Sequence, residues 1–390
     1  MKKYLFIALA AAGMLTSCST DDTVANERTN GEELVPIKIG MGNIVTNVTR
    51  GTGTVGVDPT DPSVINNLWN GELVNITMFN KGLLTLAQAG NPAADIFFNE
   101  EFKTPTGADG TAADDYAKPT DNEVRYYPTT GEFDFYGFRL DDAGNPLTAA
   151  VNGDAYTVDF DIDGTQDLLA AKSTPAAGDG YSAKASRNGV DPQLKFKHLL
   201  SRLTFEVKAA NANAAGTLDK DQDGNADGNP VVITGITVKS KHQGTLTIAN
   251  AAGDEPSAAF EDGTTDMALA GLDATNTFPL QGTTLNAGTD YAQIEDAILV
   301  APGEATYDLV VSLKQTKVKD YTDPAVTEDA ETTLNATITI PGAVGTVAEA
   351  GTSYKVQIMI YGLEEIKVYT TLTPWVESAD PITIDPDANI

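Results

Sequence analysis

Hydrophobic and polar residues alternate with a period of two along most of the chain, and no helical period recurs. Near the N-terminus, Val35, Ile37, Ile39 and Met41 alternate with polar or small residues, as a half-buried strand requires. The same pattern predicts strands over residues 74–78, 133–138, 156–162, 231–239, 244–249, 296–301, 306–314, 333–340, 353–361 and 365–372. Gly, Asn, Asp and Pro separate these runs, and many short strands joined by such turns predict an all-β fold built of sandwiches.

The segment 194–208 changes its buried side part-way along. Leu194 and Phe196 share one frame of the alternation, whereas Leu203 and Phe205 share the other. A single strand cannot switch its buried face without an extra residue, so a bulge or bend is predicted near residues 198–202.

Three polar stretches interrupt the strand pattern. Residues 172–192 are rich in Ala, Gly, Ser and Asp, and we interpret them as a domain boundary. Residues 104–123 and 209–230 are predicted to be long surface loops. With 390 residues, the chain is long enough for two domains with ordinary cores.

The N-terminus has the pattern of an exported protein. Lys2 and Lys3 precede an apolar run, Tyr4–Met14, which is too short to span a bilayer as a stable helix. The run ends in Leu-Thr-Ser-Cys18, so residues 1–18 are predicted to be a lipoprotein signal peptide, with Cys18 as the site of lipid attachment. An unmodified thiol is the alternative. Cys18 is the only cysteine, which excludes a disulfide within the chain.

The net charge of the chain limits the classes of molecule that it can bind. The 25 basic and 55 acidic residues give a net charge of -30, which argues against binding nucleic acid. The segment from Ser19 to about Glu33 is polar and without periodicity, as a tether is. We therefore expect a lipid-anchored protein at the cell surface.

Four features, in this order, resemble the fimbrillins of Bacteroidales, also called type V pilins. They are the lipobox at Cys18, the strand 35–41 followed by Asn-Val-Thr-Arg50-Gly51, the block Leu194–Val207 preceded by Asp167, and the run Tyr354–Trp375 followed by Pro381–Ile384. Together they cover nearly the whole chain.

This resemblance implies a fold and an assembly mechanism. Fimbrillins fold into two transthyretin-like β-sandwich domains in tandem, which places them here at residues 51–190 and 191–390. A protease specific for arginine or lysine cuts at the position of Arg50 and Gly51, which removes the tether and first strand, residues 19–50. The C-terminal strand of another subunit then fills the vacated groove, giving a head-to-tail surface fimbria on the outer membrane that supports adhesion.

The residues support this mechanism and leave alternatives open. Removing a well-patterned strand uncovers an apolar slot with unpaired backbone groups. Arg50 can equally be an ordinary loop arginine, and Arg28 is a competing cleavage point. Residues 376–390 are either the donor strand or a frayed tail, because Pro374, Pro381 and Pro386 would interrupt a long ladder.

One acidic segment resembles the start of a calcium-binding loop. Oxygen ligands at alternate residues, with Gly224 at the sixth position, match the beginning of an EF-hand loop. Pro230 stands at the twelfth position in place of the bidentate Glu, so a solvated acidic loop is the alternative. The candidate Ca²⁺ ligands are Asp219, Asp221, Asp223, Asn225 and Asp227.

The chain offers little for catalysis, and we predict that it is not an enzyme. Of its two histidines, His198 is predicted to be a hydrogen-bonded core residue and His242 to lie in an exposed turn. No nucleophile elbow, phosphate loop or zinc motif occurs. The alternative function is that of a surface glycan-binding outer-membrane lipoprotein, for which Trp69 in a predicted loop is the candidate platform.

Overall fold

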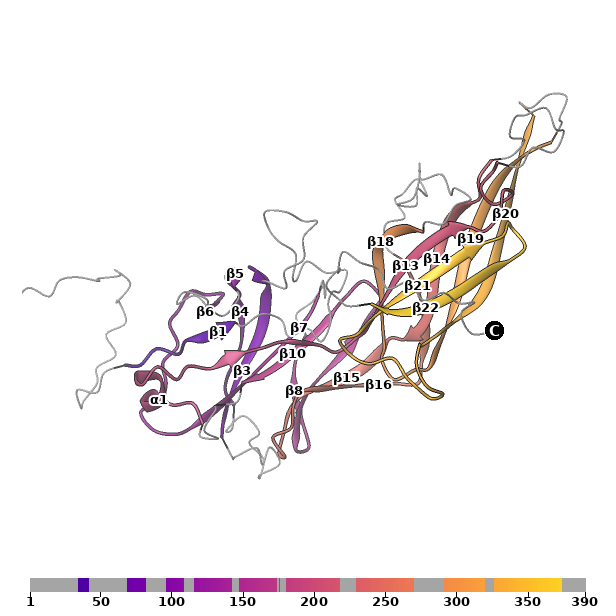
Figure 1. The fold of residues 1–390 in the computed structure, drawn as a ribbon. Helices are drawn as coiled ribbons and strands as arrows, with labels where there is room; N and C mark the ends of the chain where they lie inside the picture. The colour runs from indigo at the N-terminus through magenta and orange to yellow at the C-terminus, as the bar shows by residue number, and fades with distance from the viewer. Residues whose placement is uncertain are drawn as a thin grey trace, which may run out of the picture. The chain divides into compact units, whose positions relative to one another are not determined.

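The computed structural model describes ten parts of the chain. They cover residues 34–41, 69–81, 96–108, 116–141, 147–173, 175, 180–217, 229–269, 291–319 and 326–373. Val35–Ile390 form one compact unit, separate from Met1–Leu34. Within the described ranges the fold is all-β, as the alternation predicts, and α1 (Ala183–Arg187) is the one α-helix (Figure 1). No helix in these ranges is long and apolar enough to cross a membrane.

The largest sheet has eight strands. Their order is β11 (Gln193–Leu194), β1 (Ile39–Met41), β6 (Tyr116–Pro119), β4 (Ile96–Lys103), β3 (Leu73–Asn80), β7 (Phe133–Leu140), β10 (Leu168–Ser173) and β12 (Lys197–His198). The long strands of this sheet bury side chains that point to either side of it. Both faces of the sheet are therefore covered. On β10, for example, Leu168 and Leu169 are both fully buried, in two different apolar clusters.

A four-stranded sheet covers one face of the large sheet. It consists of β16 (Ser257–Phe260), β15 (Gln243–Asn250), β9 (Ala155–Asp161) and β8 (Ala150–Asn152). Phe79 of β3 meets Tyr156 of β9 edge-on, with ring centroids 5.4 Å apart. The outward Asp residues of β9 face solvent, so this strand alternates as its sequence predicts.

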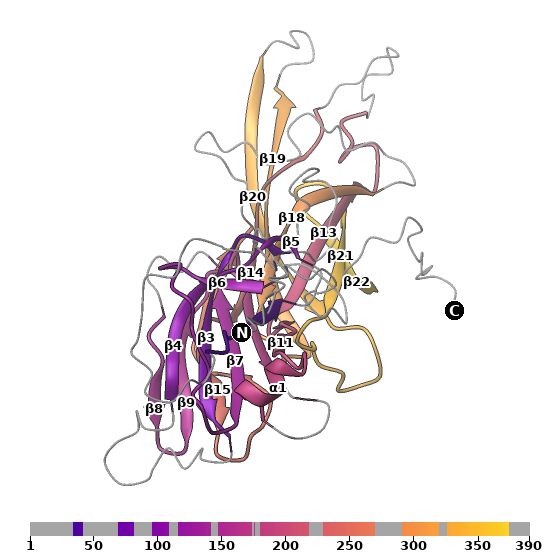
Figure 2. The ribbon, with the colours of Figure 1, turned by 90° about the vertical axis from the view of Figure 1, so that its left-hand side faces the viewer.

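Two further four-stranded sheets pack around the C-terminal part of the same core. One consists of β18 (Ala292–Val300), β13 (Ser201–Ala209), β21 (Ser353–Ile360) and β22 (Ile366–Thr373). The other consists of β17 (Thr264–Ala268), β14 (Val232–Lys241), β19 (Thr306–Val318) and β20 (Thr327–Thr339), and its β19–β20 hairpin is plain in Figure 2. A two-stranded sheet pairs β2 (Trp69–Asn70) with β5 (Thr106–Ala108).

The change of buried face predicted near residues 198–202 is confirmed. It occurs between β12 and β13, which belong to different sheets, so the chain changes sheets there and does not merely bulge. The chain makes a second such passage at His242, between β14 and β15.

Two predictions from polar composition are wrong in part. The predicted loop 104–123 contains β5 and β6, and β6 is held by pairing with β1 and β4 although its own apolar pattern is weak. The stretch 172–192 holds the end of β10 and helix α1, whose N-cap Ser182 accepts a hydrogen bond from the Ala185 amide. Division into domains at 190/191 stays a prediction, and the pairings β1–β11 and β10–β12 cross that position.

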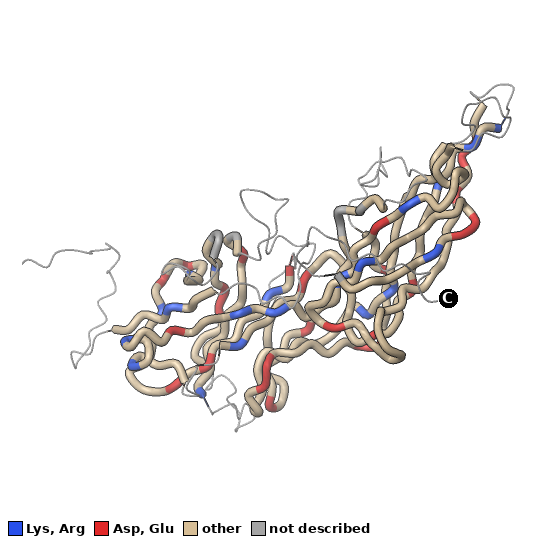
Figure 3. Tube along the Cα trace, in the orientation of Figure 1, with Lys and Arg blue, Asp and Glu red and all other residues tan. Residues whose placement is uncertain are grey.

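Charged residues of both signs are spread along the described ranges (Figure 3). Figure 3 shows Lys and Arg positions interspersed with Asp and Glu positions along the trace. Several of them form ion pairs, such as Lys355 with Glu206 at 2.6 Å. Opposite charges are thus partly paired in the described ranges.

Candidate functional site

The first strand of the chain lies inside the large sheet and not at its edge. β1 pairs in parallel with β11, where Gly40 is opposite Gln193, and antiparallel with β6, where Ile39 is opposite Ala117. A segment that would leave this position must separate from a neighbour on each side. We call the space between β6 and β11, extended along residues 125–127, the first-strand slot.

Backbone hydrogen bonds hold the first strand in the slot. The Gly40 amide donates to the Pro192 carbonyl at 2.8 Å, and the Ile37 amide donates to the Arg125 carbonyl at 2.7 Å. The Tyr127 amide donates to the Val35 carbonyl at 3.0 Å. Pro36 lies between these last two bonds in an isolated antiparallel bridge with Tyr126. On that side the slot requires no amide from residue 36, so proline is tolerated there.

Apolar side chains of the first strand enter one core cluster. Ile39 and Met41 are fully buried and Val35 is nearly so, while Ile37 packs against the same cluster partly exposed. The same cluster contains Ala117, Tyr127 and Leu194 from the walls of the slot, together with Trp69, Phe102 and Phe196. Lys38 points outward, with its ammonium 5.6 Å from the ring centre of Tyr116.

Burial agrees in part with the pattern predicted for residues 35–41. Val35, Ile39 and Met41 are buried and Lys38 is exposed, but Gly40 is also buried and Ile37 only partly so. The regular strand, however, covers only Ile39–Met41, with a single bridge at Pro36. A proline cannot donate to a ladder, which shortens the continuous pairing.

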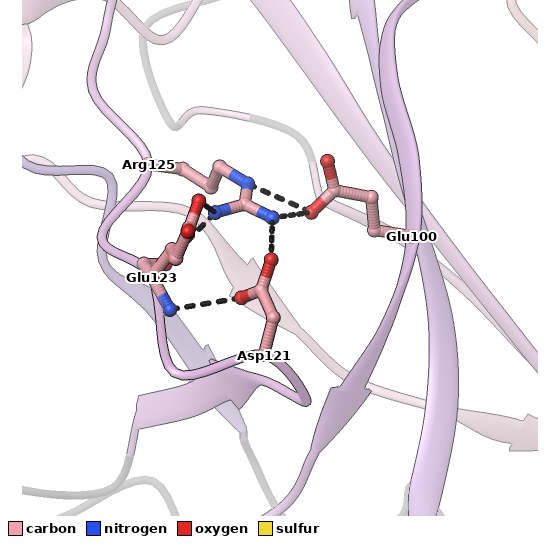
Figure 4. A network of polar contacts seen from close by, with 4 residues as sticks. All are labelled: Glu100, Asp121, Glu123 and Arg125. Atoms are coloured by element: carbon pink, nitrogen blue, oxygen red, sulfur yellow. Dashed lines mark hydrogen bonds and ion pairs between the residues drawn. The ribbon is translucent and has the colours of Figure 1, made fainter.

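Arg125 fixes the wall of the slot through an ion-pair network (Figure 4). Its guanidinium contacts Glu100 of β4 at 2.7 Å and Asp121 at 2.6 Å, and lies 3.7 Å from Glu123. It also donates to the Glu123 carbonyl at 3.1 Å. Arg125 thus binds β4 through its side chain and accepts the hydrogen bond of the Ile37 amide through its carbonyl.

Arg125 and Asp121 of this network are both charged at neutral pH. Hydrogen bonds to Glu100 and Asp121 raise the pKa of Arg125 further above its already high ordinary value. The hydrogen bond from Arg125, with a second from the Glu123 amide, lowers the pKa of Asp121. Ionisation favours the paired form on both sides, so the wall keeps its position around pH 7.

The sequence pattern does not predict that residues 125–127 line the slot. Residues 125–127 meet the first strand through one bridge only, and so short a pairing leaves no strand pattern in either partner. The signal that was present is Asp121, whose carboxylate accepts a hydrogen bond from the Glu123 amide at 2.8 Å, as turn-forming aspartates do.

Several predicted site residues lie outside the described residues. These are the lipid site Cys18, the cleavage site Arg50 and Gly51, the calcium candidates Asp219, Asp221, Asp223, Asn225 and Asp227, and the tail 376–390. Among the residues that the structure does describe, no group of three or more His, Cys, Asp or Glu is placed to hold a metal ion.

Trp69 was expected in a loop as a sugar platform, and this expectation is wrong. It lies in β2, is fully buried, and meets Phe196 edge-on with ring centroids 5.0 Å apart. Its indole belongs to the core beneath the first strand and presents no face to a ligand. The expected role of His198 is confirmed, because it is buried and its Nδ1 is hydrogen-bonded to Asp167 Oδ2.

A family model described as fimbrillin-like matches residues 63–375. The chain belongs to this family. The match includes every wall of the first-strand slot, from β6 through residues 125–127 to β11. Membership in the fimbrillin-like family supports a structural role as a fimbrial subunit, associated with other such subunits in a surface fimbria.

Three solved bacterial structures are similar to this chain at low sequence identity. A "putative cell adhesion protein" from Bacteroides uniformis is 17% identical, over 90% of this chain and 100% of that one, with a TM-score of 0.46. One so described from Bacteroides ovatus is 15% identical over 89% and 100%, with a TM-score of 0.44. The fimbrial anchor protein Mfa2 from Porphyromonas gingivalis is 8% identical over 87% and 99%, with a TM-score of 0.33. No curated protein sequence matches this fimbrillin-like chain significantly.

Proposed function

We propose that this fimbrillin-like chain is a structural subunit of a surface fimbria that polymerises after its first strand is cut away. It is exported as a lipoprotein through Cys18 and trimmed between Arg50 and Gly51 by a trypsin-like protease. A C-terminal segment of another copy then occupies the first-strand slot. The resulting head-to-tail polymer is held at the outer membrane and supports adhesion.

The observation that carries this proposal is the interior position of β1. The strand nearest the N-terminus is paired on both sides, and it is followed along the chain by Arg50. Cutting there would detach an element that has neighbours on two sides. The vacated slot would have hydrogen-bonding edges on β6 and β11 and an apolar floor between them.

Filling this slot with a new strand would be favourable in free energy. Burying one aliphatic side chain contributes about 1.5–3 kcal/mol, and three side chains of the first strand are buried. Each restored ladder bond adds about 0.5–1.5 kcal/mol. A contact in which one end of the subunit fills the other end of its neighbour does not close on itself, so it yields a filament.

The uncut chain would remain monomeric because its own first strand competes with the tail of a neighbouring subunit. A first strand still attached to its own subunit is present at an effective concentration on the order of millimolar, far above that of a neighbour's tail. Cleavage removes this advantage. Proteolysis therefore acts as the trigger of assembly in this scheme.

The test uses protein that starts at Ser19, treated with an arginine-specific protease. We expect a new N-terminus at Gly51, a ladder of bands in unheated detergent gels, and filaments by electron microscopy. Arg50→Ala should stay monomeric, and Arg28→Ala should polymerise like the wild type. Trimmed protein that stays monomeric at high concentration would refute the polymerisation scheme.

The anchoring part is tested separately in cells. A fatty acid bearing a chemical tag should label the wild-type protein, and Cys18→Ser should abolish the label. External protease should remove the protein from intact cells if it faces outward. A labelled Cys18→Ser variant would show that the lipid is attached elsewhere.

A further inference from the structure

The tail of the chain repeats the sequence of the first strand. Of the 19 prolines, only Pro36 and Pro381 are followed by isoleucine, and each begins the sequence Pro-Ile-x-Ile. The first copy is Pro36-Ile37-Lys38-Ile39, which lies in the first-strand slot. The second is Pro381-Ile382-Thr383-Ile384, close to the C-terminus.

We propose that residues 381–384 of one subunit enter the first-strand slot of another in the register of residues 36–39. This inference rests on the proposed function and assigns the partner segment and its alignment. Pro381 takes the place of Pro36, and Ile384 takes the place of Ile39. The incoming segment runs parallel to β11 and antiparallel to β6, as β1 does.

Proline is the residue that makes the register specific. Residue 36 does not need to donate a backbone hydrogen bond in the slot. The Val35 carbonyl accepts the bond on one side of it, and the Ile37 amide donates the bond on the other. A slip of one residue toward Met41 would place Pro381 at position 37 and remove the amide that binds the Arg125 carbonyl. A slip in the other direction would place Pro386 at position 40 and remove the amide that binds the Pro192 carbonyl. In the proposed register the Ile382 amide donates to the Arg125 carbonyl, as the Ile37 amide does.

The side chains agree with the same alignment. Ile384 fills the fully buried site of Ile39, and Ile382 fills the partly exposed site of Ile37. Thr383 replaces Lys38, whose side chain points to solvent. A slip of one residue toward Met41 would place Thr383 at the fully buried site of Ile39. A slip in the other direction would place Ile384 at the exposed site of Lys38.

The two ends of the segment fit less well than its centre. Asp380 would stand at the buried site of Val35, and Pro386 at that of Met41. Asp385 would stand at Gly40, where a Cβ atom would lie 2.1 Å from the end of the exposed Gln193 side chain, which must therefore swing away. The tail is thus a weaker occupant than the native strand, which explains why it would not displace an uncut one.

The tail also has sufficient length to reach a neighbour. Seven residues, 374–380, separate the end of β22 at Thr373 from Pro381. Fully extended, they span up to about 25 Å. A linker of this size allows the strand β22 to remain in its own subunit while the repeat docks in the next.

Cysteine cross-linking tests the register directly. Gly40 is opposite Tyr116 of β6, so the register places Asp385 opposite Tyr116. Protein that starts at Ser19 contains no native cysteine. After trimming at Arg50, Tyr116→Cys combined with Asp385→Cys should form covalent ladders that collapse on reduction. Tyr116→Cys combined with Thr383→Cys, which tests a two-residue slip, should not.

Matched controls keep the test interpretable. In untrimmed protein, Tyr116→Cys combined with Gly40→Cys should form a disulfide within one subunit, since this pair is adjacent in the structure. Ile384→Asn should abolish detergent-resistant ladders of trimmed protein, whereas Thr383→Lys, which restores the residue type of position 38, should leave them at the wild-type level.

The outcomes separate this inference from the proposed function. Filaments whose Thr383→Cys variant cross-links to Tyr116→Cys while the Asp385→Cys variant does not would overturn the register and leave the fimbrial role intact. Filaments that cross-link with neither variant would overturn the occupant. Absence of any filament from trimmed wild-type protein would overturn the proposed function and this inference with it.

Discussion

The two histidines of the chain each bind an aspartate, in very different surroundings. His198 and Asp167 have side chains that are only 2% and 1% exposed, at the passage from β12 to β13. His242 and Asp161 are 23% and 60% exposed, and their atoms are 2.8 Å apart. Comparing the two pairs therefore tests how strongly burial increases the contribution of a His–Asp contact to the free energy of unfolding.

We predict that His198→Ala destabilises the protein far more than His242→Ala. The first change leaves the buried Asp167 without the imidazole, which costs about 2–4 kcal/mol of unfolding free energy. The second removes a solvated contact and should cost no more than about 0.5 kcal/mol. Urea unfolding at neutral pH measures both, and equal losses would contradict the structural role assigned to His198.

A second residue-scale prediction concerns pH and the wall of the slot. Arg125 lowers the pKa of Asp121 below its ordinary 3.8, so the pairing stabilises the fold at neutral pH and is lost as pH falls through that lowered value. Arg125→Met should therefore be less stable than the wild type at pH 7, and the difference should shrink near pH 2.5.

Urea unfolding at the two pH values checks this dependence. Lys118→Met removes the same charge from an exposed position on the neighbouring β6 and serves as the control. Its difference from the wild type should stay nearly constant between the two pH values. A pH-independent effect of Arg125→Met would show that Arg125 acts through packing alone.

At the scale of elements, alternation in the sequence predicts long strands well and short ones poorly. The run 353–361 corresponds to β21, which buries mainly one of its faces. The run 133–138 corresponds to β7, which buries large apolar side chains on both faces. β6 is only four residues long and buries Ala117 alone, so its formation depends on β1 and β4. Tertiary contacts specify such short strands, and their sequences contain no hydrophobic alternation that could predict them.

β20 shows the same limit at its N-terminal end. The sequence predicts 333–340, whereas the strand begins at Thr327, because pairing with β19 extends it through residues that carry no apolar pattern. These added residues include Glu328, Asp329 and Glu331, on the last strand of its sheet. Charges on an edge strand discourage pairing with a second molecule.

We predict that these acids keep the β20 edge from unwanted association. A variant with Glu328→Thr, Asp329→Thr and Glu331→Thr should keep its fold but aggregate at high concentration, since threonine favours strands and carries no charge. Light scattering measures the effect. Asp262→Asn, Glu364→Gln and Glu365→Gln together remove as many charges from exposed positions outside the strands and should not aggregate. Equal aggregation of both variants would point to net charge alone.

At the scale of the whole molecule, the sheets are joined through shared strands and shared core. The chain passes from the eight-stranded sheet to the sheet of β13 at residues 199–200, and from the sheet of β14 to that of β15 at His242. One apolar cluster contains residues of both β9 and β21. Sequence composition suggested a boundary at residues 172–192 because a polar stretch looks like a linker, but composition cannot show which strands pair across it.

This connectivity predicts that the described fold unfolds in one cooperative transition. Trp69 reports on the cluster beneath the first strand, and Ile358 is buried in the other cluster, on β21. In a Trp375→Phe background, which leaves Trp69 as the only tryptophan, Ile358→Val should lower stability by about 0.5–1.5 kcal/mol. The urea transition followed by Trp69 fluorescence should shift as far as that followed by circular dichroism.

The reason is that the eight-stranded sheet lies between the two clusters, with Leu168 in one and Leu169 in the other. Loss of the cluster around Ile358 would strip one face from the sheet that supports Trp69, so neither cluster can persist alone. If the Trp69 signal keeps its midpoint while circular dichroism shifts, the chain consists of two independently folding domains, as the resemblance to fimbrillins implies for residues 51–190 and 191–390. Coincident shifts would mean that docking a new strand in the slot stabilises the entire subunit, including the sheets that do not touch it.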